Sequence, residues 1–168
     1  MINTMADGNH ALRKALALHQ QGNLAEAARI YRQVIKKSPD NLHAFHYLGA
    51  IEAASGNIER AKSLMARSLS ANPPNLMFIE NYATLLCQAG DFRTALQVCR
   101  QGLQIDKTSA VLLFNSALAL FKTEQLQEAL RTFDTLLLFH KRHFAALNER
   151  GSVPVSYTHL TLPTIYSV

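Results

Sequence analysis

The chain has 168 residues, nearly half of them apolar, with few glycines and prolines. This composition fits one folded domain with a real core and excludes an intrinsically disordered chain. The formal net charge of +5 at pH 7 comes from scattered lysines and arginines, a pattern that favours a role in solubility over an attraction to acidic partners.

The remaining composition predicts a soluble cytoplasmic protein without a membrane partner. Residues 1–9 contain no charged leader followed by an apolar stretch, so no signal peptide is indicated. The longest apolar run, 110–121, is interrupted by polar residues and is shorter than the ~18 residues of a spanning helix. Cys87 and Cys99 fit apolar positions of different predicted helices, so we expect buried, reduced thiols.

Apolar residues at helical spacing, separated by turn residues, predict a series of helix pairs. Residues 1–8 show no periodicity and are expected to form a disordered N-terminus. The predicted helices then follow in chain order: 9–21 and 24–37, 42–55 and 58–71, 76–89 and 92–105, 110–122 and 126–139, and a partial fifth pair from 144. Glycines Gly22, Gly56 and Gly90 separate the helices of the first three pairs, because glycine accepts the left-handed conformation that ends a helix. Glu124 takes this place in the fourth pair.

A fixed repeat relates these pairs to one another. Alanines recur every 34 residues (61 − 27 = 34), at Ala27, Ala61, Ala95 and Ala129. Small residues recur with the same step at Ala15, Gly49, Ala83, Ala117 and Gly151. Large apolar residues recur at Tyr31, Met65, Cys99 and Phe133. A period of this length is the signature of a solenoid of helix pairs.

These columns, together with the glycine turns and the prolines Pro39 and Pro73, resemble the tetratricopeptide-repeat (TPR) family. The resemblance covers Asn9 to about Val153. It implies an all-α fold, a right-handed α-solenoid of antiparallel helix pairs with about four and a half repeats. The repeats are 8–41, 42–75, 76–109, 110–143 and a partial one at 144–153.

The end of the sequence, 154–168, fits none of these columns. Its uncharged stretch 155–164 resembles the translation of a transposase-type sequencing adapter, so we expect a non-native read-through tail. On this interpretation the natural protein continues beyond about Val153, and the chain is a fragment. We then expect an apolar patch at the uncapped C-terminal repeat edge and self-association through it, because repeat arrays need polar terminal caps.

Residues that carry chemistry in known sites are not found in the required patterns. The sequence has no nucleophile elbow, phosphate-binding glycine loop or paired-cysteine motif, so we predict no enzyme activity and no cofactor. His43 and His46 lie three residues apart on one helix face, but a third metal ligand is too distant. We expect both to be exposed histidines on a binding face. For the basic stretch 140–143 we expect a solvated loop between repeats, and the alternative is a site for an acidic ligand. No interleaved aromatic residues indicate nucleic-acid stacking.

The family resemblance implies a concave face, formed by the first helix of each pair, that holds peptides. By the repeat register this candidate peptide-binding face comprises His43, His46, Tyr47, Met77, Glu80, Asn81, Thr84, Val111, Phe114, Asn115 and Leu118. Asn81 and Asn115 occupy equivalent positions, and an amide that both donates and accepts can hold an extended backbone. The pair resembles two rungs of the asparagine ladder of O-linked N-acetylglucosamine transferases. The alternative is two surface asparagines without a role.

The function predicted from the sequence is a protein-binding or peptide-binding scaffold without chemistry of its own. A second hypothesis is the truncated substrate-recognition arm of a bacterial TPR glycosyltransferase, because 17–27 and 145–151 resemble the repeats ahead of such enzymes. It rests on family analogy, and the downstream sequence distinguishes it. A third hypothesis is a self-assembly scaffold, which the solution mass of the full-length protein distinguishes.

Overall fold

The structure is a computed structural model that describes the backbone of residues 2–153 and the side chains of residues 10–153. Within these residues it contains nine helices and no strand, so the all-α prediction is confirmed. The helices are α1 (Ile2–Gln20), α2 (Leu24–Lys37), α3 (Leu42–Ala54), α4 (Ile58–Ser68), α5 (Leu76–Gln88), α6 (Phe92–Ile105), α7 (Ala110–Lys122), α8 (Leu126–Phe139) and α9 (Phe144–Ser152). The predicted read-through tail, 154–168, lies outside the described residues.

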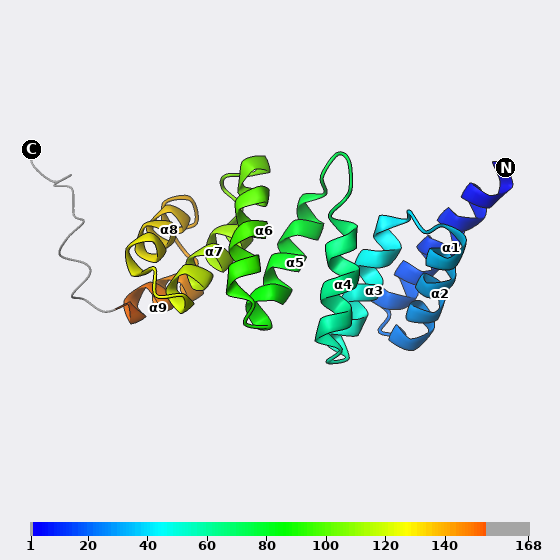
Figure 1. The fold of residues 1–168 in the computed structure, drawn as a ribbon, viewed down its shortest axis with the longest axis horizontal. Coiled ribbons are helices and arrows are strands. Elements are labelled where there is room, and N and C mark those ends of the chain that lie inside the picture. The colour runs from blue at the N-terminus through cyan, green and yellow to red at the C-terminus, as the bar shows by residue number, and fades with distance from the viewer. Residues whose placement is uncertain (1, 154–168) are drawn as a thin grey trace, which may run out of the picture. The chain divides into compact units, whose positions relative to one another are not determined.

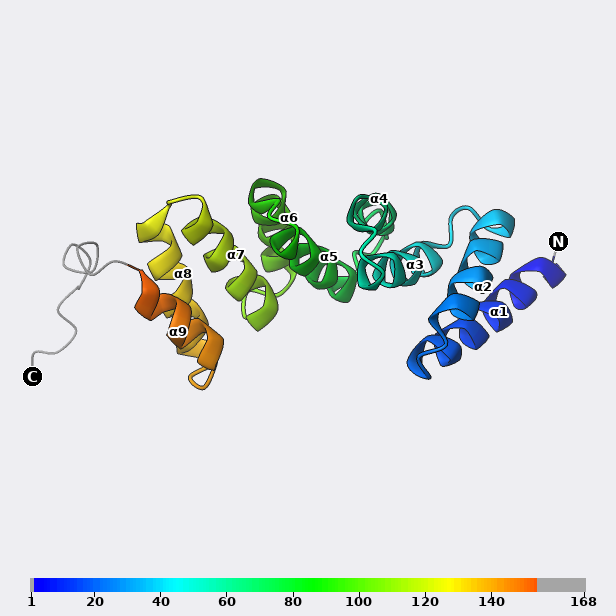
Figure 2. The same ribbon diagram turned by 90° about the horizontal axis from the view of Figure 1, so that it is seen from below.

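Packing divides the chain into two compact units, and the boundary in the chain falls within α5, between Phe78 and Ile79. In the first unit α1 packs on α2, α2 on α3 and α3 on α4, as Figure 1 shows. In the second unit α6 packs on α7, α7 on α8 and α8 on α9, and Figure 2 shows α8 beside both α7 and α9. Each unit is therefore built from consecutive helices joined by short turns.

Side-chain caps fix where several first helices begin. The Asn41 side chain accepts a hydrogen bond from the Ala44 amide at 3.0 Å ahead of α3. Ser109 accepts one from Leu112 at 3.2 Å ahead of α7, and the His143 ring accepts one from Ala146 at 3.1 Å ahead of α9. Each bond satisfies an amide that the first helical turn leaves without an intrahelical partner.

Two helix boundaries differ from the sequence prediction by more than one residue. The first helix begins at Ile2 instead of residue 9, since no proline interrupts the segment before the first repeat and an existing helix extends more easily than a new one forms. Helix α4 ends at Ser68 instead of residue 71. Its last turn tightens, with the Leu69 amide bonded to Ala66 and the Ser70 amide to Arg67, ahead of two consecutive prolines that cannot continue a helix.

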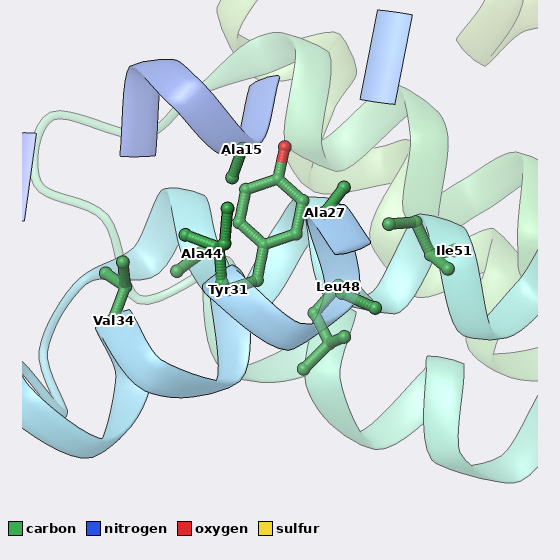
Figure 3. Packing of buried hydrophobic residues seen from close by; sticks show 9 residues of the cluster. Ala15, Ala27, Tyr31, Val34, Ala44, Leu48 and Ile51 are labelled. Atoms are coloured by element: carbon green, nitrogen blue, oxygen red, sulfur yellow. The ribbon is translucent and has the colours of Figure 1, made fainter. Parts of the chain in front are cut away.

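The repeating contact within the four complete pairs joins a small residue of the first helix to an apolar residue of the second, which is large in every pair but the third. Ala15, Ala83 and Ala117 are fully buried, as are Tyr31, Cys99 and Phe133. Figure 3 shows the Tyr31 side chain extending from α2 toward Ala15 of α1. A Cβ atom at Gly49 would lie 2.7 Å from Cγ of Met65. These positions are small because the backbones approach closely there.

The turn inside each of the first four pairs has one residue in the left-handed conformation. Gly22, Gly56 and Gly90 have φ between 76° and 82°, and Glu124 keeps the same turn with φ of 62°. Glu124 therefore adopts the same left-handed turn conformation as the glycines at the equivalent positions. A glutamate in this conformation is strained by about 1–2 kcal/mol, because its Cβ crowds the following carbonyl oxygen.

Replacing Glu124 with glycine should relieve this strain. We expect Glu124→Gly to raise the free energy of unfolding by about 0.5–1 kcal/mol. This is less than the strain that is relieved, because glycine has a higher conformational entropy in the unfolded chain. Urea unfolding followed by circular dichroism measures the change. As a control, Arg131→Gly in the middle of α8 should lower stability by about 1 kcal/mol. Destabilisation by both substitutions would show that Glu124 is not strained.

Candidate functional site

A pocket of about 510 Å³ in the first unit is the leading candidate for a ligand site. Its lining comes from α1, from the start of α3, from the links before α3 and α5, and from Phe78. The lining residues are Leu12, Asp40, Asn41, Leu42, His43, Ala71, Asn72, Pro73, Asn75 and Phe78. Apolar side chains thus form the interior, with exposed polar groups of Asp40, His43 and Asn72 at the rim.

This pocket lies where the repeat is interrupted. Helix α4 has 11 residues, whereas α2, α6 and α8 have 14 each. The link 69–75 that follows α4 is longer than the links 38–41, 106–109 and 140–143. In the second unit the His140 ring and the Thr108 carbonyl, from two successive links, are joined at 2.7 Å. Their counterparts in the first unit, Asn72 and Asp40, instead stand at the pocket rim.

Aromatic rings form the wall between the pocket and the core. The His46 ring stacks on Phe78 with centroids 4.1 Å apart and an interplanar angle of 16°. The His43 ring meets the edge of the same phenylalanine at 5.1 Å. Tyr47 lies 5.5 Å from His46 and stacks on Tyr31 at 5.8 Å. The wall is therefore a rigid aromatic cluster, with His43 as its exposed member.

The prediction of two exposed histidines is wrong for His46, which is only 1% exposed. The reason is Phe78, whose ring covers His46 from the following helix. Burial, followed by the charge of nearby His43, lowers the pKa of His46 to about 4. Within the described residues, no group of three or more histidine, cysteine, aspartate or glutamate side chains could hold a metal ion.

The two predicted asparagines, Asn81 and Asn115, do not have equivalent surroundings. Asn81 is exposed, whereas Asn115 is 5% exposed. The Asn115 amide nitrogen donates to the Thr84 hydroxyl at 2.9 Å, and the Asn115 backbone carbonyl lies 3.5 Å from the Cys87 sulfur. Asn115 therefore ties α7 to α5 inside the second unit. Of the two asparagines, Asn81 is the one that lies at the surface.

The other predicted face residues differ in how much surface they offer. Glu80 is half-buried and accepts a hydrogen bond from the Ser109 hydroxyl at 2.7 Å, which joins α5 to the link before α7. Met77 in the first unit and Val111 in the second are each 41% exposed. Half-buried side chains complete the set: Tyr47, Thr84, Phe114 and Leu118. The Phe114 ring lies 5.2 Å from that of His143.

Sequence reasoning missed most of the pocket lining. Leu12, Asp40, Asn72 and Pro73 were not among the predicted face residues, because the repeat register places a residue on a face but does not show where a link moves aside. The signal that was present is the Asn72-Pro73-Pro74 stretch, which departs from the other links.

Cys87 and Cys99 are free and buried, as the sequence predicts. Burial raises the pKa of Cys87 to about 11 and that of Cys99 to about 12. Both thiols are therefore held in the protonated form at neutral pH, which makes them poor nucleophiles. In the described part of the chain, none of the helices has the length and apolar character needed to cross a bilayer.

Comparison with known proteins identifies the fold. A family model described as tetratricopeptide repeat matches residues 18–77 and 86–148, which confirms the repeats predicted from the sequence. No curated protein matches the chain.

Solved structures give the same fold. The chain is similar to YrrB, a TPR protein with an unusual peptide-binding site, with a TM-score of 0.79 and 18% identity over 89% of this chain and 76% of that one. It is also similar to the MamA protein, with a TM-score of 0.82 and 13% identity over 95% and 85% of the two chains. A third similar structure is Pseudomonas aeruginosa pilF, with a TM-score of 0.77 and 15% identity over 94% and 71%. At these identities the likeness shows the fold alone, an all-α helical-repeat solenoid.

Burial of the neutral His46 ring makes stability depend on pH. Its folded pKa of about 4 lies below its ordinary value of 6.5, so on acidification the unfolded chain takes up a proton first. This contribution to stability is complete above about pH 6.5 and falls toward pH 4, by at most about 1.4 kcal/mol per pH unit.

We expect His46→Phe to flatten the pH dependence between 6.5 and 4, because phenylalanine keeps the ring stack but does not titrate. Phe114 occupies the equivalent position in the fourth pair, so the repeat accepts this residue there. Urea unfolding at several pH values measures the difference. Parallel stability curves for wild type and variant would contradict the buried neutral ring.

Proposed function

The chain belongs to the tetratricopeptide-repeat family, and on this premise we propose that it is a binding module that holds an extended segment of a partner protein. The segment lies against the first unit and places one apolar side chain in its pocket. In this proposal the chain acts by recognition and brings no catalytic group to the site.

The observation that carries the proposal is the pocket at the interruption of the repeat. Its volume of about 510 Å³ falls within the range of roughly 300–1,000 Å³ for ligand sites. A repeat that followed its own pattern would have a longer α4 and a shorter link at this place. Departures from local regularity are expected where function requires them.

The lining suits a peptide more than a charged metabolite. Half-buried Leu12 and Leu42 offer apolar contact to a side chain, and exposed Asn72, Asp40 and His43 offer hydrogen-bonding groups. The aromatic stack behind Phe78 holds this wall in one conformation, so little entropy is lost when a ligand binds. The description of YrrB as a protein with a peptide-binding site supports the same class of ligand.

A peptide selection tests this function directly. Random peptides displayed on phage are selected on the purified chain, and the enriched peptides are synthesised with a fluorescent label. Anisotropy titrations then compare wild type with His43→Asp, which places a second acidic group beside Asp40 at the rim, and Ala71→Trp, which fills the pocket. We expect each variant to weaken binding by about tenfold or more, equivalent to about 1.4 kcal/mol.

The matched control is Gln97→Asp, an exposed position on the second helix of the third pair, α6. Like His43→Asp, it makes the net charge less positive, but it lies outside the proposed face. Wild-type affinity in this variant, with loss in the two pocket variants, supports the proposal. Failure to enrich any peptide, or equal affinity in all variants, would contradict it.

A further inference from the structure

An apolar surface that no described residue covers lies on α8 and α9 of the second unit. Leu138 and Phe139, at the end of α8, are 70% and 50% exposed, and Phe144 and Leu147 of α9 are 73% and 44% exposed. Gly151, one turn beyond Leu147, is exposed as well. We call these five residues the α9 patch. Large apolar side chains gathered at one place in this way mark an interaction surface.

The other pairs show what this face of α9 is built to contact. Leu147 stands in the same repeat position as Phe45, Ile79 and Leu113, which are only 4–5% exposed. Gly151 stands in the column of small residues, of which Ala15, Ala83 and Ala117 are fully buried. At Gly49 an added Cβ would meet Met65 at 2.7 Å, whereas at Gly151 it would meet nothing within 4 Å. In each complete pair a second helix covers these positions, and among the described residues none covers them on α9.

The opposite face of α9 is anchored, so the patch is presented by an ordered helix. Ala146 is fully buried. The Arg150 side chain donates to Asp134 of α8 at 2.6 Å.

We propose that a second copy of this chain covers the α9 patch, with the two α9 helices antiparallel about a two-fold axis. Phe144 and Gly151 lie on one face of α9, seven residues or two helical turns apart. In an antiparallel pair, the projecting Phe144 of each copy therefore faces the open Gly151 position of its partner, as a self-complementary interface requires.

The charge of this face favours a second copy as the occupant. Phe144, Leu147, Asn148 and Gly151 form the face and none of them is charged. A two-fold axis brings identical residues together, and like charges there would repel each other. The face of α9 therefore lacks the feature that would prevent self-pairing.

The size of the patch predicts a weak dimer. An aromatic side chain buries about 150–250 Å² when it is fully covered. With the exposed fractions above, the four large side chains offer on the order of 400 Å² per copy. A standard interface uses about 800 Å² per partner. We therefore expect monomers at low concentration and dimers at high concentration.

Analytical ultracentrifugation of the full chain over a range of about 1–500 µM tests the proposal. We expect the weight-average mass to rise toward twice the monomer mass. Leu147→Glu should keep the chain monomeric over the same range, because it places like charges at the two-fold axis. Ile105→Glu is the control, since Ile105 is a 50% exposed apolar residue at the end of α6, and it should dimerise like wild type. Circular dichroism verifies that both variants are folded.

Cross-linking tests the predicted register independently of mass. A mixture of Phe144→Cys and Gly151→Cys chains should form a disulfide-linked dimer under mild oxidation, in at least about tenfold higher yield than either variant alone. The natural cysteines are buried and serve as an internal control. A monomer at all concentrations would assign the patch to another protein or another segment and overturn the proposal. Association that survives Leu147→Glu would overturn it as well.

Discussion

The close contact between a small residue on the first helix and a large residue on the second determines how each pair is built. Tyr31 reaches Ala15, and Met65 reaches Gly49, because no larger side chain keeps the helices apart at these points. The contact fixes which face of each first helix is hidden by its own pair. Another face of α3, α7 and α9 packs on the preceding helix, and the surface that stays exposed is left for ligands.

Much of the fold could be predicted from the sequence, because the repeat supplies several copies of the same signal. The helices α2, α6, α7 and α8 have the predicted bounds. The site was less predictable, since it depends on contacts between neighbouring pairs. His46 lies on the predicted face, yet the ring of Phe78 buries it. The Asn115 side chain donates a hydrogen bond to the Thr84 hydroxyl inside the second unit. Neither contact can be inferred from periodicity, which assigns a direction to a side chain and not its neighbours.

The two proposed interaction surfaces share a physical origin, although they lie in different units. In the first, a shortened α4 and a long link leave a pocket at the place where two successive links of the second unit are in direct contact. In the second, α9 presents a face that other first helices bury. A repeat protein buries its apolar surface through identical contacts, so any interruption leaves apolar surface available to a partner. We therefore expect the binding surfaces of this chain at the places where the repeat pattern is interrupted.

The most direct test of this account is the same substitution at two positions of the small-residue column. Gly49→Ala adds a Cβ within 2.7 Å of Met65, whereas Gly151→Ala adds one into open space. Overpacking lowers the free energy of unfolding by about 1–3 kcal/mol. Replacing a helical glycine with alanine raises it by up to about 1 kcal/mol at either site. Urea unfolding at low protein concentration should therefore show Gly49→Ala less stable than Gly151→Ala by about 1–3 kcal/mol. Equal stability of the two variants would contradict the pair contact on which the account depends.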